Sequence, residues 1–191
     1  PSGFARRCAA IDSPAFFRYD GAEVKAMAER QAHPIAPVFD ETSRVLILGS
    51  FPSVKSREAA FFYGHPQNRF WRVLAAVLGC AVPATIDEKR GMLLAHHIAV
   101  WDVIASCEIT GSSDSSIRDV VPTDLGRILA AAPISAIFCN GGTALRLYQK
   151  YQQNSTGIPA AGLPSTSPAN AAWTLNRLVS VWNVIRTELE K

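Results

Sequence analysis

The 191-residue sequence lacks any apolar run long enough to cross a bilayer. Its first residues, PSGFARRCAAIDSPAF, contain two arginines but no apolar core of signal-peptide length, which predicts an intracellular, cytoplasmic protein. Charge is also scarce, because charged residues make up 18% of the chain and the net charge is +3. Such a mild positive bias is compatible with a polyanionic partner but is weak evidence for one.

Closely spaced cysteines are absent as well. Cys8, Cys80, Cys107 and Cys139 stand far apart, whereas zinc and iron–sulfur sites usually contain at least one close pair. Cys107 and Cys139 lie at the ends of apolar runs, so we expect buried, reduced thiols there. The four histidines show no metal-ligand spacing either, and we therefore predict no metal and no other cofactor.

The motifs of three common enzyme classes are also missing. No G-x-G-x-x-G follows the first apolar segment, and neither G-x-x-x-x-G-K-[ST] nor G-x-S-x-G occurs anywhere. Dinucleotide binding, P-loop phosphate binding and a serine nucleophile thus lose their main support. A reaction that needs only positioning and electrostatics remains.

What the sequence does contain is an alternation of short apolar segments and helical patterns. We predict strands at 45–49, 98–104, 134–140 and, more weakly, 157–164. We predict helices at 68–78, 87–96, 123–132, 143–149 and 169–189. Because no strand alternates cleanly between polar and apolar residues, both faces of the sheet should be covered. The pattern therefore predicts a three-layer α/β/α fold around a four-stranded parallel sheet.

The length and the pattern together predict one domain over residues 1–191. We expect residues 44–191 to form its core. Residues 1–43 are predicted to form an ordered lead-in with a short helix at about 22–31.

Small polar residues follow each of the four predicted strands. The segments are GSFPS, ASCEITGSS, NGGT and LPSTSPAN. In open parallel sheets, ligands bind outside the carboxyl ends of the strands, so we expect these segments to converge on one site. None is acidic enough for a magnesium site, which favours an uncharged or anionic ligand.

The block GSFPSVKSRE…FYGHPQNRFW, between positions 49 and 71, resembles the uracil-DNA glycosylase superfamily. It is most similar to family 6, the hypoxanthine-DNA glycosylases. The resemblance extends through IAVWDVIASCEITGSSDSSI (98–117), FCNGGTA (138–144) and LPSTSPAN (163–170). It implies a uracil-DNA glycosylase-like fold and a monofunctional DNA glycosylase that hydrolyses uracil, hypoxanthine or both from DNA and so initiates base-excision repair.

Two positions depart from the pattern of the wider superfamily. Most members carry Asp or Asn where this sequence has Phe51, and that residue positions the attacking water. The late motif of most members begins with His or Asn, which donates to the leaving base, whereas here it begins with Leu163. Family 6 tolerates both changes, and the resemblance implies that an asparagine matching Asn68 carries the reaction instead.

The catalytic candidates are Asn68 and Ser50. Asn68 offers an acceptor for water and an NH₂ donor for the leaving base. The alternative is that Asn68 only caps the helix that begins at Arg69. Asp102, just inside the second strand, could activate water, but an acceptor that braces a loop is the favoured assignment. We expect His65 to be a structural turn residue.

The base-binding candidates are Tyr63, Phe51 and Asn140. Tyr63 would stack on the base once it is extruded from the helix, and otherwise is a packed loop aromatic. Phe51 would line the second face of the pocket or fill the core. Asn140 would read the base edge or order its loop.

Contacts to DNA are predicted for two loops. In the first, hydroxyls and positive charges could clamp phosphates, and a solvated surface loop is the alternative. Its candidates are Ser50, Ser53, Lys55, Ser56 and Arg57. In the second, residues 164–170 would enter the minor groove, with helix N-terminal amides available for phosphate. Its candidates are Ser165, Ser167 and Asn170; the alternative is a solvent-facing loop with Asn170 as a plain helix cap.

The predicted partner is single- or double-stranded DNA that contains deaminated bases, bound by a monomer associated with a bacterial-type nucleoid and not with a membrane. No lysine stands where a Schiff-base nucleophile would be expected, so strand cleavage is not predicted. Two alternatives remain open: a non-catalytic binder of damaged DNA or nucleic acid, and a small-molecule nucleoside hydrolase or nucleotide-binding enzyme.

Overall fold

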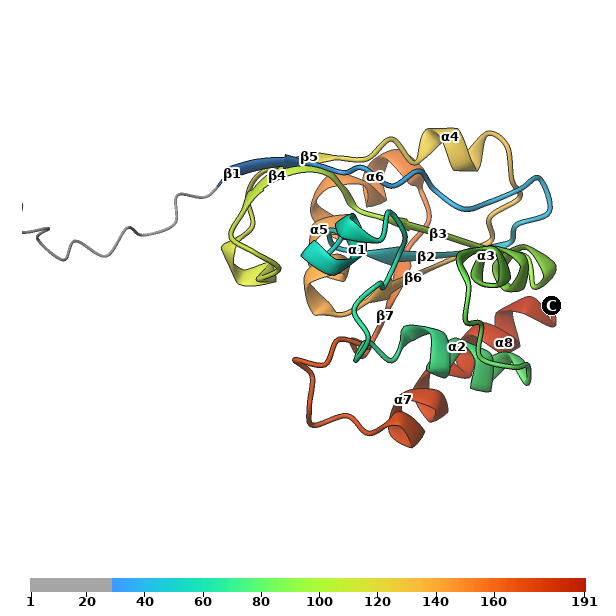
Figure 1. Ribbon diagram of the computed structural model, residues 1–191. Helices are drawn as coiled ribbons and strands as arrows, with labels where there is room; N and C mark the ends of the chain where they lie inside the picture. Colours follow the sequence, from blue (N-terminus) through green and yellow to red (C-terminus); the bar gives the residue numbers. More distant parts are fainter. Residues whose placement is uncertain (1–28) are drawn as a thin grey trace, which may run out of the picture.

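The computed structural model describes residues 29–191, and a four-stranded parallel sheet forms its centre (Figure 1). The strands are β2 (Val45–Gly49), β3 (Ile98–Asp102), β6 (Ala136–Asn140) and β7 (Ala160–Leu163), in the order β3-β2-β6-β7. Every residue of β2 and β3 is buried, as expected for strands that are covered on both faces. All four strands lie within the predicted ranges.

Helices flank the sheet on both sides (Figure 1). They are α1 (Val54–Glu58), α2 (Phe70–Leu78), α3 (Ile86–Ala95), α4 (Gly126–Leu129), α5 (Gly142–Tyr151), α6 (Gln153–Thr156), α7 (Leu175–Trp182) and α8 (Val184–Leu189). Helix α5 packs against β6 and β7, α3 against β3, and α8 against β2. The prediction of a three-layer α/β/α fold is confirmed.

Helix α2 illustrates how the sequence determines an element next to the site. Phe70, Trp71 and Leu74 lie on its buried side, and burying each such side chain contributes about 1.5–3 kcal/mol. The helix ends at Gly79, whose φ of 70° lies in the left-handed region where glycine carries no steric penalty. The apolar face anchors α2 on α7, so its first turn has a fixed position beside the sheet.

A second, antiparallel sheet was not predicted. It contains β1 (Glu29–Ala32), β4 (Ile104–Ile109) and β5 (Arg118–Pro122), in the order β1-β4-β5. The apolar run 98–104, predicted as one strand, divides at Val103, whose backbone N–H still bonds to the Gly49 carbonyl. Val103 and Ile104 are fully buried on both sides of this division, so apolar periodicity carried no signal of it.

Three predicted helices need correction. The final segment 169–189 is not one helix, because α7 begins only at Leu175 and Asn183 separates it from α8. Of the segment 123–132, only α4 is helical, although hydrogen-bonded turns continue to Ala132. Of the helix predicted at 22–31, residues 22–28 lie outside the described residues and residues 29–31 belong to β1.

Among residues 29–191, no helix combines the length and the apolar character needed to cross a membrane. Cys107 and Cys139 are buried free thiols, as predicted, and Cys8 lies outside the described residues.

Candidate active site

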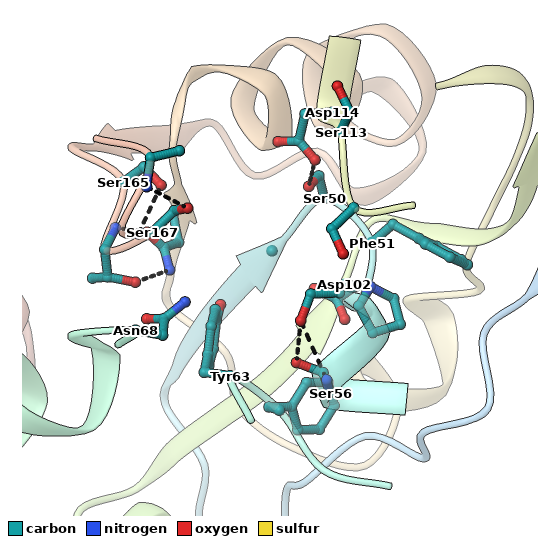
Figure 2. Close-up of a pocket in the computed structure, with 18 of the residues that line it drawn as sticks. Ser50, Phe51, Ser56, Tyr63, Asn68, Asp102, Ser113, Asp114, Ser165 and Ser167 are labelled. Carbon is teal, nitrogen blue, oxygen red and sulfur yellow. Dashed lines mark hydrogen bonds between the residues drawn. The ribbon is translucent and has the colours of Figure 1, made fainter. Parts of the chain in front are cut away.

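A cavity of about 480 Å³ opens at the carboxyl edge of the parallel sheet (Figure 2). Its floor contains the last residues of three strands, Gly49, Asp102 and Asn140. Its walls come from four loops: residues 50–53, 62–68, 109–114 and 165–170. The volume lies in the range typical of small-ligand sites. The predicted convergence of the polar segments that follow the strands is thus what the structure shows.

Gly49 allows two strand ends to approach closely. A Cβ atom at this position would lie 2.1 Å from Asp102 Oδ1 and 3.3 Å from the Tyr63 hydroxyl. The first distance is far shorter than any real contact, so a side chain at position 49 would displace the Asp102 carboxylate. The glycine therefore lets the carboxylate lie across the end of β2.

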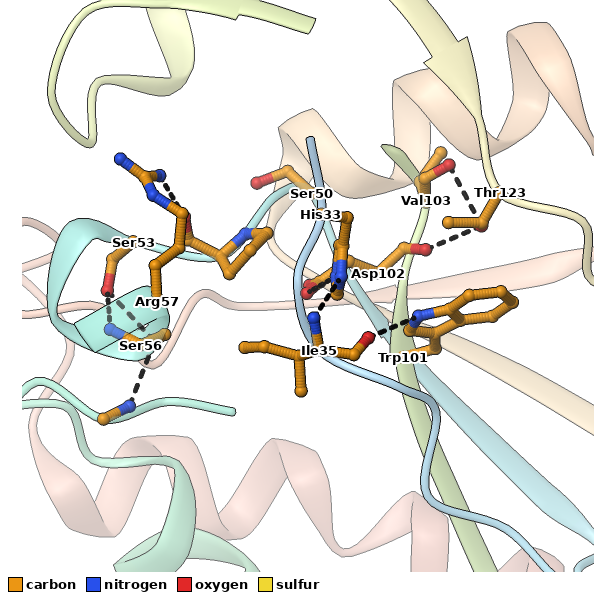
Figure 3. Close-up of polar contacts among 12 residues, drawn as sticks. His33, Ile35, Ser50, Ser53, Ser56, Arg57, Trp101, Asp102, Val103 and Thr123 are labelled. Carbon is orange, nitrogen blue, oxygen red and sulfur yellow. Dashed lines mark hydrogen bonds and ion pairs between the residues drawn. The ribbon is translucent and has the colours of Figure 1, made fainter. Parts of the chain in front are cut away.

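Asp102 is buried, with 4% of its surface exposed, and its Oδ2 lies 2.8 Å from His33 Nε2 (Figure 3). The Ile35 backbone N–H donates to His33 Nδ1 at 3.1 Å, so Nδ1 is the acceptor and Nε2 carries the proton that Asp102 accepts. The predicted role of Asp102 as a bracing acceptor has this contact in its favour. Its other oxygen, Oδ1, has no hydrogen-bond partner among residues 29–191.

Tyr63 stacks on Phe70, with ring centroids 3.8 Å apart and planes 16° from parallel. One ring face is therefore covered by protein, and a stacked base could use only the other. The Tyr63 hydroxyl is buried without a hydrogen-bond partner in the described part of the chain. Burial raises the pKa of Tyr63, the negative charge of Asp102 raises it further, and the nearby Asn140 carboxamide lowers it only slightly. The hydroxyl thus stays protonated at neutral pH.

Asn68 combines the two roles that were weighed for it. The Phe70 backbone N–H donates to one atom of the Asn68 carboxamide at 2.9 Å, which identifies that atom as Oδ1. The oxygen therefore satisfies the start of α2. The Nδ2 donor forms no hydrogen bond with the described residues, and Asn68 lines the cavity beside Tyr63 (Figure 2). Capping consumes the acceptor and leaves the donor available.

Arg69, which the sequence analysis did not single out as a site residue, holds the late loop in place. Its guanidinium donates to the backbone carbonyls of Thr166, Ser167, Asn170 and Trp173, at 3.3, 2.7 and 3.0 Å for the first three. Hydrogen bonds from a charged donor contribute about 1.5–3 kcal/mol each. One side chain thereby ties the first turn of α2 to a loop about 100 residues later in the chain.

The late loop is braced internally as well. Ser165 Oγ accepts the Ser167 N–H, and Ser167 Oγ accepts the Ala169 N–H. Asn170 donates through Nδ2 to the Ser165 carbonyl at 2.9 Å. Asn170 is not a helix cap, because Thr174 caps α7 by accepting the Arg177 N–H. That alternative is wrong, and the loop has no helix N-terminal amides of its own to offer.

Asn140 has both ends of its carboxamide engaged by Thr166, which is fully buried. Its Nδ2 donates to Thr166 Oγ1 at 2.9 Å, and its Oδ1 accepts the Thr166 N–H at 3.0 Å. These contacts favour loop ordering over reading of a base edge. Phe51 lines the cavity and is 8% exposed, with its ring edge-on to His33 at 5.9 Å.

Ser50 stands at the rim of the cavity and donates to Asp114 Oδ1 at 2.9 Å. Partial removal from water raises the pKa of Asp114, and the charge of Asp102 adds to this, whereas the Ser50 bond lowers it. Asp114 was not predicted as a site residue. No histidine lines the cavity, so the described residues provide no general base next to Ser50.

The proposed phosphate clamp is mostly committed to its own helix. Ser53 caps α1 by accepting the Ser56 N–H, and the buried Ser56 hydroxyl accepts the Gly64 N–H. Lys55 pairs with Glu58 at 2.7 Å on the exposed surface. Arg57 donates to the Pro52 carbonyl. Lys55 and Arg57 do not line the cavity, and their contact with DNA stays a prediction.

The electrostatics of the cavity are one-sided. Asp102 and Asp114 line it, whereas no lysine, arginine or histidine does. Two carboxylates in a partly desolvated site favour a positive charge that develops nearby. Within residues 29–191, no three His, Cys, Asp or Glu side chains group closely enough to hold a metal ion.

A parallel sheet with a mixed polar and aromatic cavity at its carboxyl edge defines an α/β protein that binds a small planar group at the strand ends. A model of the uracil DNA glycosylase superfamily matches residues 36–186. The chain therefore belongs to that superfamily, as its sequence motifs indicated.

Individual relatives agree with this assignment. The chain is 33% identical to a hypoxanthine DNA glycosylase of Methanosarcina acetivorans over 149 residues, which are 78% of this chain and 93% of the relative. It is 36% identical to a hypoxanthine DNA glycosylase of Methanosarcina barkeri over 92 residues, or 48% and 57% of the two chains. The solution structure of a candidate uracil DNA glycosylase from M. acetivorans superposes with a TM-score of 0.71 at 32% identity, covering 82% of this chain and 97% of the other.

Proposed function

We propose that this protein is a monofunctional DNA glycosylase that hydrolyses the N-glycosidic bond of deaminated bases in DNA, and so initiates base-excision repair. Hypoxanthine is the favoured base, because the curated relatives are named for it. Uracil is the second candidate, since the superfamily and the structural neighbour are named for that base. We further propose that the enzyme acts as a monomer on nucleoid DNA in the cytoplasm.

The arrangement around Asn68 is the observation that carries the proposal. Breaking the bond between base and deoxyribose builds positive charge on the sugar and negative charge on the departing base. The Asn68 Nδ2 group, left free by the cap, can donate to that base. The carboxylates of Asp102 and Asp114 favour the cationic sugar. Both developing charges thus have a complementary group in the same cavity.

A lysine-dependent lyase step has no support in this cavity, because no lysine of the described chain lines it. We therefore propose that the product is an intact strand with an abasic site. Phe51 at the position of the usual acid or amide leaves water positioning to polar groups elsewhere in the cavity.

An oligonucleotide assay tests this function. Single-stranded and duplex oligonucleotides with one uracil or one hypoxanthine are incubated with the protein, and abasic sites are then cleaved with alkali. We expect strand scission only after the alkali step. Scission without alkali would contradict monofunctional chemistry. Absence of abasic sites on all four substrates would favour a non-catalytic binder, and release of bases from free nucleosides alone would favour a nucleoside hydrolase.

A further inference from the structure

The floor of the cavity holds a carboxylate oxygen that the protein leaves unpaired. Asp102 is 4% exposed and lines the cavity, and its Oδ1 forms no hydrogen bond with residues 29–191. Asn68, by contrast, is half-buried in the wall. A flipped nucleotide enters base first, with its sugar still attached to the strand outside. The deepest polar group therefore faces the base edge, whereas the wall faces the glycosidic bond.

The orientation of this carboxylate is imposed by His33. The Ile35 N–H holds His33 Nδ1 as an acceptor, so Nε2 donates to Asp102 Oδ2, and Oδ1 is the oxygen left over (Figure 3). The His33 backbone N–H bonds to the Ala105 carbonyl at 2.8 Å, which fixes the segment. The side chain of His33 is 3% exposed, and Phe51 and Trp101 lie edge-on to its ring. His33 lies outside the part of the chain that matches the superfamily model.

The chemistry of deamination suits an acceptor at this place. Hypoxanthine carries a hydrogen on N1 and uracil carries one on N3, whereas adenine N1 and cytosine N3 are bare acceptors. An ionised carboxylate can only accept hydrogen bonds. It pairs with the N–H of a deaminated base and faces a lone pair when adenine or cytosine is presented instead.

We propose that Asp102 determines specificity by accepting the ring N–H of the deaminated base, and that His33 is the positioning residue that aims it. This rests on the proposed function. A buried site built to bind an N–H rejects analogues without it by roughly 10⁴–10⁵-fold when the partners are left unpaired. Even a partly hydrated edge should discriminate by roughly 10²-fold.

The first test compares two bases that differ at this edge. The full chain is given oligonucleotides that carry hypoxanthine or unsubstituted purine, whose N1 is an acceptor, and single-turnover cleavage rates are measured. In Asp102→Asn the amide can donate to purine N1, so we expect the hypoxanthine-to-purine rate ratio to fall by roughly 10²-fold. Asp87→Asn, at an exposed position of α3 outside the cavity, is the matched control and should keep the ratio.

The outcomes separate the possible roles of Asp102. An equal loss on both bases would assign it to the attacking water and overturn the proposal. An unchanged ratio with a lower melting temperature would make it a structural brace and overturn it as well. If the wild-type protein cleaves no substrate, the proposed function fails, which differs from cleavage with an unchanged ratio.

A matched pair of variants tests His33. Glutamine places an amide donor near the position of Nε2, whereas asparagine reaches only as far as Nδ1. We expect His33→Gln to keep the wild-type ratio within about 3-fold and His33→Asn to lower it by roughly tenfold. Melting temperatures of both variants serve as the stability readout. The same ratio in His33→Asn and the wild-type protein would remove His33 from specificity.

Discussion

The two sides of the cavity are built in different ways. On one side, Asn68 and Arg69 belong to a continuous segment that also begins α2, and Asn68 is half-buried. On the other side, Asp102 ends a central strand, is buried, and takes its partner His33 from 69 residues earlier in the chain. The first side is local in sequence, whereas the second exists only in the folded chain.

This difference bears on what each side can do. A buried carboxylate is costly unless it is paired, and the His33 bond fulfils that need while leaving Oδ1 available. Such a group is rigid and suits discrimination between bases. Asn68 is held through one atom only, at a helix start, and offers an uncharged donor to an anionic leaving group. We therefore expect changes on the Asn68 side to affect rate and changes on the Asp102 side to affect base choice.

The largest effect is expected at Asn68. Asn68→Ala removes the donor and should lower the single-turnover cleavage rate by roughly 10²-fold or more. It also removes the acceptor of the Phe70 N–H, which should cost about 1 kcal/mol of stability. Asn68→Asp keeps that acceptor, so its stability should match the wild type while its rate falls. Wild-type turnover in Asn68→Asp, or a phenotype in stability alone, would make Asn68 a cap and nothing more.

Arg69→Ala should have the next largest effect. Four carbonyls of the late loop lose their charged donor, and we expect a loss of about 2 kcal/mol in the free energy of unfolding, measured by urea denaturation. Arg69→Lys should recover only part of this, because an ammonium lacks the planar fork that reaches several carbonyls. Equal stability of the Lys variant and the wild type would show that charge alone suffices.

Tyr63→Ala should lower cleavage of the lesion by roughly tenfold, with a smaller effect on binding to undamaged DNA. The ring contributes about 1–3 kcal/mol of stacking, and only once the base is extruded. Tyr63→Phe keeps the ring and its contact with Phe70 and removes a buried hydroxyl without a partner. It should be as stable as the wild type or up to about 1 kcal/mol more stable. An equal loss on both DNAs in Tyr63→Ala would make Tyr63 a folding residue.

The smallest effect is expected for Ser165→Ala and Ser167→Ala. Each removes one hydroxyl that accepts a backbone N–H within the late loop, while Arg69 still holds that loop. We expect roughly a 3-fold loss of cleavage rate with a nearly unchanged melting temperature. Full wild-type turnover in the double variant would argue against a role of this loop in DNA binding.

The local features of this protein could be predicted from its sequence because each depends on neighbours along the chain. The apolar run Val45–Gly49 predicted a buried strand, and the spacing of Phe70, Trp71 and Leu74 predicted α2. The polar segments after each strand predicted where the cavity would lie, because parallel strands end at one edge. Asn68 was recognised in the same way, since it stands directly before a helix start.

Pairings between distant segments were decided only by the tertiary structure. No periodicity distinguishes β3 from β4 within 98–109, because buried residues stand on both sides of Val103. The final helix was predicted to begin at 169, but the carbonyls of Ser167 and Asn170 bond to Arg69 and α7 begins only at Leu175. Composition alone could not show which distant donor those carbonyls would find.

The sequence by itself determined the order of strands and helices, the edge where the cavity opens and the superfamily. The tertiary structure alone decided that His33 would meet Asp102, which of the two carboxylate oxygens would face the cavity, and that Asn140 would be consumed by Thr166. The physical reason is that hydrophobic periodicity is a property of each segment. The pairing of a buried polar group, by contrast, depends on which other segment packs within hydrogen-bonding distance.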